Sequence, residues 1–152
     1  MKAKVGAAKT TLSAPLGNIN VHIRDGAAIL LHLQPAYTIE ETRQGPYSLL
    51  VSQTAEGYAF GTAYIDDGVS YPPGPNRTLV FQVQRGNVRI ESHGSFEVRQ
   101  KLREVVVLGT TRPRKVSVGG GVVVGWSFFD ARKKLVMEVE LDLNEVVTTL
   151  EW

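Results

Sequence analysis

The fold class is decided by residues 78–91, which read Thr78-Leu79-Val80-Phe81-Gln82-Val83-Gln84-Arg85-Gly86-Asn87-Val88-Arg89-Ile90-Glu91. Apolar side chains recur at every second position before and after the Arg85-Gly86-Asn87 segment, which is the spacing of half-buried β-strands. Glycine and asparagine between two such runs are typical of a tight turn. The stretch therefore predicts two strands joined by a hairpin turn.

The same pattern extends along most of the chain of 152 residues. Residues 20–24 alternate, Asp25-Gly26 is a typical hairpin turn, and residues 27–31 form a second apolar run. Further strands are predicted at 48–52, 58–65, 96–98, 105–108, 122–124, 127–129 and 135–141. Many short strands separated by turn residues predict an all-β fold, and we expect an antiparallel β-sandwich.

Three stretches need separate treatment. Residues 98–106 have apolar side chains at helical spacing, and residues 143–150 follow Asp142, a possible helix cap, so either stretch fits a helix as well as a strand. Residues 71–76 contain three prolines and are predicted to form a surface loop.

Composition excludes several classes of function. The formal net charge of +2 is too small to indicate nucleic-acid binding. The absence of cysteine excludes disulfides, zinc-thiolate sites and thiol nucleophiles. No apolar run approaches the ~20 residues that a membrane-spanning helix needs, and the apolar run at the start is too short for a signal peptide. We therefore expect no nucleic-acid or membrane partner, and no residue pattern calls for a cofactor.

Two segments carry a family resemblance. Residues 14–26, Ala-Pro-Leu-Gly-Asn-Ile-Asn-Val-His-Ile-Arg-Asp-Gly, are similar to the signature that follows the catalytic barrel in family 31 α-glucosidases. Residues 61–70, Gly-Thr-Ala-Tyr-Ile-Asp-Asp-Gly-Val-Ser, follow in the family's order, and the closing residues 150–152 also match. The chain thus resembles the C-terminal β-sandwich region of glycoside hydrolase family 31.

The resemblance implies an organisation and a role. Residues 1–33 would be the trailing strands of a proximal β domain, and residues 34–152 the distal β-sandwich. The catalytic carboxylates of the family lie on its barrel, so this chain alone is expected to be non-catalytic and to support the barrel of a parent α-glucosidase. Residues 126–130 only superficially resemble the nucleophile motif and are predicted to end in a turn. Exposed strand edges favour docking or homo-oligomerisation.

Aromatic side chains suggest an alternative, carbohydrate binding, because aromatic faces pack on the apolar faces of sugar rings. The candidates are Trp126, Tyr64, Tyr71 and Tyr47. Core packing of Tyr64 and Trp126, with Tyr71 on the proline-rich loop, is the competing interpretation. Trp152 is predicted to anchor the last strand in the core.

The adjacent acids Asp66 and Asp67 are candidates for a sugar-hydroxyl or calcium contact. The competing interpretation is turn chemistry, in which each carboxylate accepts backbone N–H groups and Gly68 supplies a positive φ. His22, His32 and His93 lack metal-ligand spacing, so no metal site is predicted.

Asn76-Arg77-Thr78 is an N-glycosylation sequon next to the predicted loop. With the resemblance, Asn76 favours a secreted glycoprotein parent. Two basic clusters, 112–115 and 132–134, are interpreted as solvated turns, with binding of an anionic partner as the alternative.

Three functions therefore remain open. The first is the non-catalytic module of a family 31 enzyme. The second is a free-standing lectin-like or starch-binding protein that recognises an α-glucan or another carbohydrate, and the third is a secreted interaction protein.

Overall fold

The computed structural model describes residues 11–119, 121–122 and 125–152. Its strands are β1 (Ala27–His32), β2 (Tyr47–Ser52), β3 (Tyr58–Ile65), β4 (Arg77–Gln84), β5 (Asn87–Gly94), β6 (Leu102–Leu108), β7 (Ser117–Val118), β8 (Gly121–Val122), β9 (Trp126–Phe129), β10 (Lys134–Leu141) and β11 (Val147–Glu151). One α-helix, α1 (Ile39–Gln44), and one 3₁₀ turn, η1 (Asp130–Arg132), complete the described elements.

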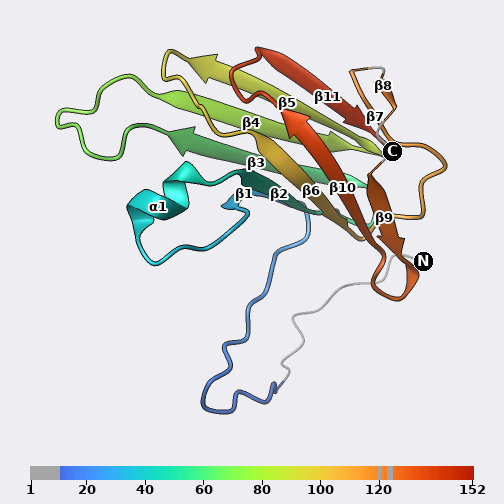
Figure 1. Ribbon diagram of the computed structural model, residues 1–152. Helices are drawn as coiled ribbons and strands as arrows, with labels where there is room; N and C mark the ends of the chain where they lie inside the picture. Colours follow the sequence, from blue (N-terminus) through green and yellow to red (C-terminus); the bar gives the residue numbers. More distant parts are fainter. Residues whose placement is uncertain (1–10, 120, 123–124) are drawn as a thin grey trace.

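The strands of the described residues form one sheet, in the order β8-β7-β11-β5-β4-β3-β1-β2-β6-β10-β9. The sheet bends so that β6 and β10 lie across β3, β4 and β5, with one apolar core between the two halves (Figure 1). Neighbouring strands are antiparallel except for two parallel pairs, β1–β3 and β2–β6. The all-β, sandwich-like class is therefore confirmed, with the two layers joined through β1 and β2.

The core comes from the inward side chains of both layers. Leu79 and Phe81 of β4 are fully buried, as are Leu135 and Met137 of β10 and Leu150 of β11. Each of these side chains is two residues from the next inward one on its strand, as the period-two pattern requires. Burial of such apolar area is the main force that holds the two layers together.

The hairpin that opened the sequence analysis is confirmed. β4 and β5 pair from Arg77 opposite Gly94 to Gln84 opposite Asn87. The two residues between them, Arg85 and Gly86, both have positive φ, of 45° and 86°. Positive φ at both positions gives a two-residue turn the twist that matches its flanking strands.

β1 lies in the middle of the sheet, where it pairs with β2 and β3. Its contact with β3 depends on Gly61, because a Cβ at Gly61 would lie 1.8 Å from the carbonyl oxygen of Ala28. Only glycine permits so close an approach of two backbones. The predicted domain boundary after Leu33 stays a prediction, and β1 is the part of the first segment that enters this sheet.

Two predicted strands are wrong. Residues 20–24 form no strand and pair with none. Val21 within this stretch is exposed, as is the preceding Ile19. The predicted 20–31 hairpin is thus replaced by pairing of β1 with β2. Residues 96–98 form no strand although Val98 is buried, because the side chain of Asn144 bonds both the N–H and the C=O of Val98. Residues 123–124 of the predicted 122–124 strand lie outside the described residues.

The helical alternatives are also wrong, since residues 102–108 form β6 and residues 147–151 form β11. The one described α-helix, α1, was not predicted. Within the described part of the chain, no helix has the length and apolar character needed to cross a lipid bilayer.

Candidate carbohydrate-binding site

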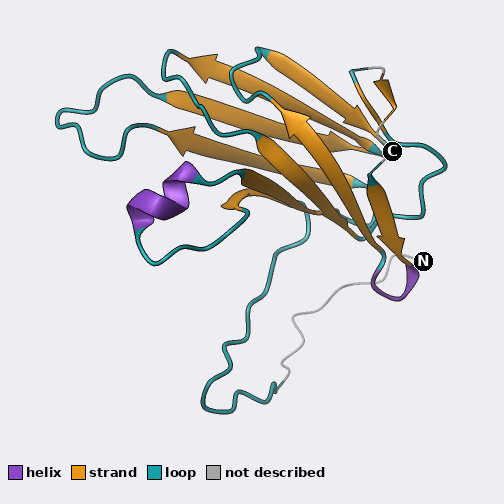
Figure 2. Ribbon diagram, in the orientation of Figure 1, coloured by secondary structure: helices purple, strands orange, loops and turns teal. Residues whose placement is uncertain are grey.

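α1 and the β3–β4 loop lie together at one end of the sheet (Figure 2). α1 begins after Thr38, whose Oγ1 accepts a hydrogen bond from the backbone N–H of Glu41 at 3.1 Å. This cap satisfies one of the free N–H groups of the first turn. Thr38 and Glu41 have the Ser/Thr-x-x-Glu spacing of a capping box, which is the sequence signal that identifies α1.

Two adjoining cavities, of about 520 and 300 Å³, lie between α1 and the end of β3. Both are lined by Arg43 of α1, Tyr47 of β2 and Asp66. Asp67 lines the larger cavity, and Tyr64 lines the smaller one. We call this region the α1 cleft.

Arg43 is held by the β3–β4 loop. Its guanidinium donates a hydrogen bond to the backbone carbonyl of Asp66 and lies 3.6 Å from the carboxylate oxygen of the same residue. Gly68, with φ of 74°, makes room for this guanidinium, because a Cβ at Gly68 would lie 1.7 Å from it. The positive charge of Arg43 is therefore compensated by Asp66.

The turn interpretation of Asp66 and Asp67 is confirmed. Asp66 Oδ1 accepts the N–H of Gly68 at 2.9 Å, and Asp67 Oδ1 accepts the N–H groups of Val69 and Ser70 at 3.1 and 3.0 Å. The hydroxyl of Ser70 also donates to Asp67 and, with the two N–H groups, lowers the pKa of Asp67 to about 2. Asp67 is thus ionised at neutral pH and unsuited to act as a general acid.

Two rings form the floor of the smaller cavity. His32 and Tyr47 lie with their ring centroids 4.9 Å apart. Burial, and then the charge of Arg43, lowers the pKa of His32, while burial raises the pKa of Tyr47. Both rings are therefore neutral at pH 7. Tyr47 is buried, so it forms part of the wall of the cleft and has little surface for a sugar to stack on.

The remaining aromatic candidates are dispersed. The predicted core packing of Tyr64 is wrong, because its side chain lies on the outer side of β3 and is 57% exposed beside the cleft. Tyr71 is 96% exposed on the proline-rich loop, as predicted. Trp126 lies in β9 at the far edge of the sheet, half-buried against the core as predicted, and η1 follows as the predicted turn. The structure brings Tyr64, Asp66 and Asp67 together, but not Tyr71 or Trp126. Sequence reasoning missed Arg43 and His32 as cleft residues.

Asn76 of the sequon is exposed and immediately precedes β4. Its backbone carbonyl accepts hydrogen bonds from the N–H groups of Ser95 and Phe96. These backbone bonds hold the chain at Asn76 without using its side chain. Among the described residues, no group of three or more His, Asp or Glu side chains is arranged to hold a metal ion.

Comparison with known proteins places this architecture among glycoside hydrolases. The chain is 41% identical over 138 residues to an α-glucosidase of Candida tsukubaensis, a match of 88% of this chain and 13% of that protein. It is 37% identical over 128 residues to an uncharacterized family 31 glucosidase of Schizosaccharomyces pombe, covering 84% of this chain and 13% of that protein. No protein-family model matches the chain.

A solved structure agrees in fold. The glucosidase II α subunit, crystallised with bound Tris, superposes with a TM-score of 0.66 at 14% identity, over 86% of this chain and 16% of that chain. The fold and the relatives together define a β-rich region of a glycosidase. The chain belongs to glycoside hydrolase family 31, and the relatives cited are an α-glucosidase and an uncharacterized family 31 glucosidase. The chain spans about an eighth of the length of each.

Proposed function

We propose that this chain is a non-catalytic β-sandwich module of a family 31 α-glucosidase, and that it supports the catalytic barrel by packing against the rest of that enzyme. The relatives support the proposal, because each matches the chain over only a small share of its own length. The proposed partner is therefore the remainder of such an enzyme.

One observation carries the proposal: an exposed apolar surface on the outer side of β1 and β3. Its residues, which we call the outer face, are Ile29, Leu31, Tyr58, Phe60 and Tyr64. Ala27 pairs with Phe60 in the parallel β1–β3 register, which places alternate residues of both strands on this one side of the sheet. Phe60 is 58% exposed and Tyr64 57%. A contiguous apolar patch of this kind marks an interaction surface.

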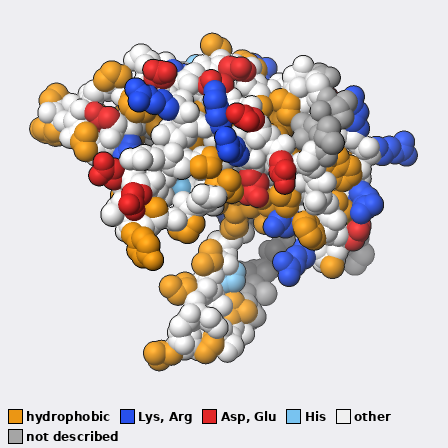
Figure 3. Space-filling model, viewed as in Figure 1, with side chains coloured by type: hydrophobic (Ala, Val, Ile, Leu, Met, Phe, Trp, Pro, Cys, Tyr) orange, Lys and Arg blue, Asp and Glu red, His pale blue; other side chains and the backbone are white. Residues whose placement is uncertain are grey.

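The segment before β1 adds to the same argument. Residues 11–26 stand out from the sheet, and hydrophobic side chains line the projecting part (Figure 3). Leu16, Ile19 and Val21 are all exposed there. Leu12 is also 48% exposed. Four exposed large apolar side chains among sixteen residues that form no strand support contact with another part of a larger protein.

A chimera tests this proposal. The matching region of the Candida tsukubaensis α-glucosidase is replaced with this chain, and the isolated chain is assayed in parallel with p-nitrophenyl α-glucoside. We expect glucosidase activity in the chimera, loss of activity when the region is deleted, and none in the isolated chain. Release of p-nitrophenol that follows the isolated chain through purification at constant specific activity contradicts the proposal.

A paired substitution tests the surface itself. Phe60→Ser in the chimera should lower its Tm, whereas Val147→Ser, at an exposed apolar position on β11, should leave the Tm unchanged. Equal effects of the two substitutions would contradict packing through the outer face. Light scattering on the isolated chain reports the alternative, in which a second copy covers this face.

Carbohydrate recognition at the α1 cleft is the second candidate function. It is favoured by the exposed ring of Tyr64, which lines the smaller cavity with Asp66, while Asp67 lines the adjoining larger cavity. Aromatic stacking with flanking hydrogen-bond acceptors is the usual way of binding a sugar. Calorimetric titration with maltose and longer maltooligosaccharides should give heat that Tyr64→Ala abolishes and Tyr71→Ala preserves. No heat at millimolar sugar contradicts this function.

The exposed sequon at Asn76 supports the further proposal that the parent enzyme passes through the secretory pathway. Expression of the chain with a secretion signal in yeast should yield a product that glycosidase treatment shortens, and Asn76→Gln should abolish this shift.

A further inference from the structure

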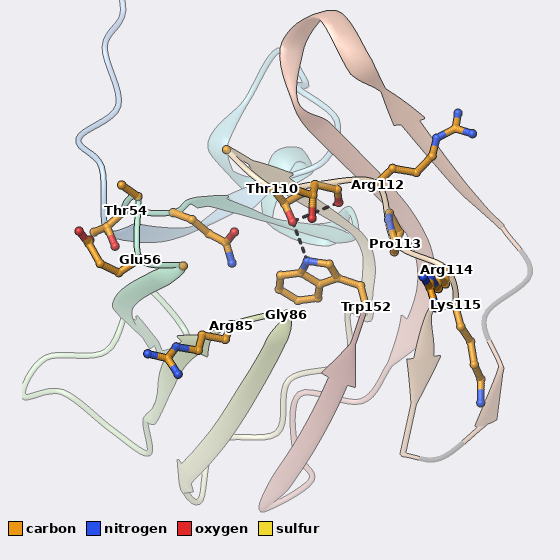
Figure 4. A pocket seen from close by; sticks show the side chains of 15 residues that line it. Thr54, Glu56, Arg85, Gly86, Thr110, Arg112, Pro113, Arg114, Lys115 and Trp152 are labelled. Atoms are coloured by element: carbon orange, nitrogen blue, oxygen red, sulfur yellow. Dashed lines mark hydrogen bonds between the residues drawn. The ribbon is translucent and has the colours of Figure 1, made fainter.

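A cavity of about 590 Å³ lies at the opposite end of β3 from the α1 cleft. The turns before β3 and before β5 border it, together with residues 109–115 and Trp152 (Figure 4). We call it the Trp152 pocket. The support of a catalytic barrel proposed above does not involve this pocket, and the candidate carbohydrate-binding residues Tyr64, Tyr71 and Trp126 do not line it.

Trp152 is fixed in place at this pocket. Its indole N–H donates to Thr110 Oγ1 at 3.0 Å, and its backbone N–H donates to the carbonyl of Gly86 at 2.8 Å. Gly86 allows this contact, since a Cβ there would lie 2.7 Å from the Trp152 carbonyl oxygen. The indole is therefore a pre-positioned aromatic wall, partly packed on the core and partly facing the cavity.

The pocket is strongly basic. Four cationic side chains line it, and Glu56 is the one acidic side chain among the lining residues. In Figure 4 Arg85 lies on one side of the indole, and Arg112, Arg114 and Lys115 lie on the other. The charged ends of Arg85, Arg112 and Lys115 are directed away from the indole, so these residues form the rim of the pocket. A cavity lined by charges of one sign concentrates ions of the opposite sign.

Internal partners compensate little of this charge. Arg112 lies 3.7 Å from a carboxylate oxygen of Asp130, but both side chains are well exposed, and such pairs are weak. Arg85 lies over the ring of Tyr58, with its guanidinium carbon 5.8 Å from the ring centroid. Arg43 of the α1 cleft differs from these residues, because the carboxylate of Asp66 compensates its charge.

A buried hydrogen-bond donor, the side-chain amide of Gln53, also indicates that the pocket binds a ligand. Gln53 lines the pocket and is only 8% exposed, yet its Nε2 has no hydrogen-bond partner among the described residues. A buried amide N–H without an acceptor is less stable than a satisfied one. An oxygen atom brought into the cavity would supply the missing acceptor.

We propose that the Trp152 pocket binds an anionic saccharide, a sugar carrying a sulfate, phosphate or carboxylate group. The indole of Trp152 stacks on the sugar ring, the Gln53 amide donates to a ligand oxygen, and the cationic rim, chiefly Arg114 and Lys115, attracts the anionic group. Residues 112–115, for which the sequence left binding of an anionic partner as an alternative, line this pocket.

Calorimetry on the complete chain tests the assignment with a heparin-derived tetrasaccharide, glucose 6-phosphate, inorganic sulfate, maltotetraose and tetraglutamate as probes. We expect the acidic saccharides to bind at least about tenfold more tightly than maltotetraose, and binding to weaken with added salt. Equal binding of sulfate alone or of tetraglutamate would overturn recognition of a saccharide, as would no binding by any acidic sugar.

Matched variants locate the site. The double substitution Arg114→Gln with Lys115→Gln should weaken binding at least about tenfold, while Arg132→Gln with Lys133→Gln, at the other exposed basic cluster, should not. Gln53→Leu should weaken binding without lowering the Tm, because it removes an unsatisfied donor. Equal losses from the two double variants, or full affinity in Gln53→Leu, overturn the proposal.

Fluorescence gives an independent measurement. In a Trp126→Phe background, Trp152 is the remaining tryptophan, and its emission should change on addition of the tetrasaccharide with the affinity found by calorimetry. Unchanged emission at saturating ligand contradicts stacking on Trp152.

Discussion

The two faces of β3 and its neighbours differ in what covers them, although both are apolar. On the inner side, Phe81 of β4 is fully buried between the two layers. On the outer side, Phe60 of β3 is more than half exposed. A strand that is apolar on both faces is typical of a sheet that is covered on both sides. The inner face therefore stabilises the fold of this chain, and the exposed outer face supports the proposal that it packs against a partner.

Truncation on the inner face should have the largest effect. Phe81→Ala removes most of a fully buried aromatic side chain and leaves a cavity between the layers. We expect the free energy of unfolding of the isolated chain to fall by about 3–5 kcal/mol, measured by urea denaturation. A loss below about 1 kcal/mol would show that the two layers do not pack on each other as described.

A buried arginine on the inner side should come next. Arg77 Nε donates to the carbonyl of Phe96 at 2.6 Å, and its Nη1 donates to Ser92 Oγ at 2.8 Å. Arg77→Met keeps the length of the side chain but leaves these acceptors unpaired, and should cost about 1–3 kcal/mol. Arg89→Met, at an exposed position on β5, is the control and should change stability by less than about 0.5 kcal/mol.

The charge of Asp142 at the turn before β11 should matter less than the buried side chains of Phe81 and Arg77. Lys101 Nζ lies 2.5 Å from Asp142, and this hydrogen bond, followed by those from Asn144, lowers the pKa of Asp142 from 3.8 to about 2. The folded state therefore favours the ionised form, so the stabilisation is present above pH 3.8 and is lost as the pH falls toward 2.

The variant Asp142→Asn isolates this effect. Both partners of the pair are about a third exposed, so we expect less than about 1 kcal/mol at pH 6. The difference between the variant and the unaltered chain should shrink toward pH 2 in urea denaturations at a series of pH values. A difference that is constant with pH would show that the carboxylate charge is not the cause.

The smallest effect is expected on the outer face of the isolated chain. Phe60→Ser should change its free energy of unfolding by no more than about 0.5 kcal/mol, because the ring already contacts solvent. The contrast with Phe81→Ala on the adjacent strand defines the difference between the two faces. A loss of 2 kcal/mol or more, on the order of a buried side chain, would place Phe60 inside the fold.

Most of the sheet could be predicted from period-two patterning, because β3, β4, β5 and β10 turn every second side chain toward the inner face. β6 instead buries the three consecutive side chains of residues 105–107. The error at residues 96–98 has a long-range cause, because the side chain of Asn144, 46 positions further on, bonds the backbone of Val98 without a strand. The missed helix has a local cause: α1 has only six residues, so Thr38 and Glu41 are its main sequence signal. Residues 20–24 alternate like a strand but have no neighbour to pair with.

The sites were less predictable than the fold. The Asp66 and Asp67 turn follows from local chemistry, since each carboxylate bonds residues two or three positions on. Arg43 reaches the same loop across 23 positions, and Gln53 and Trp152 meet only because β2 and β11 end at the same side of the sheet. Contacts between such distant segments depend on strand order, which local patterning does not specify.

Hydroxyl-radical footprinting can test whether the outer face packs against the rest of a family 31 enzyme. The isolated chain and the chimera are labelled in parallel, and the modification of each aromatic residue is measured by mass spectrometry. If the outer face is covered, modification of Phe60 and Tyr64 should fall several-fold in the chimera. Tyr71, on the exposed loop, should be modified equally in both proteins. Equal modification of Phe60 and Tyr64 in the two proteins would contradict packing through the outer face.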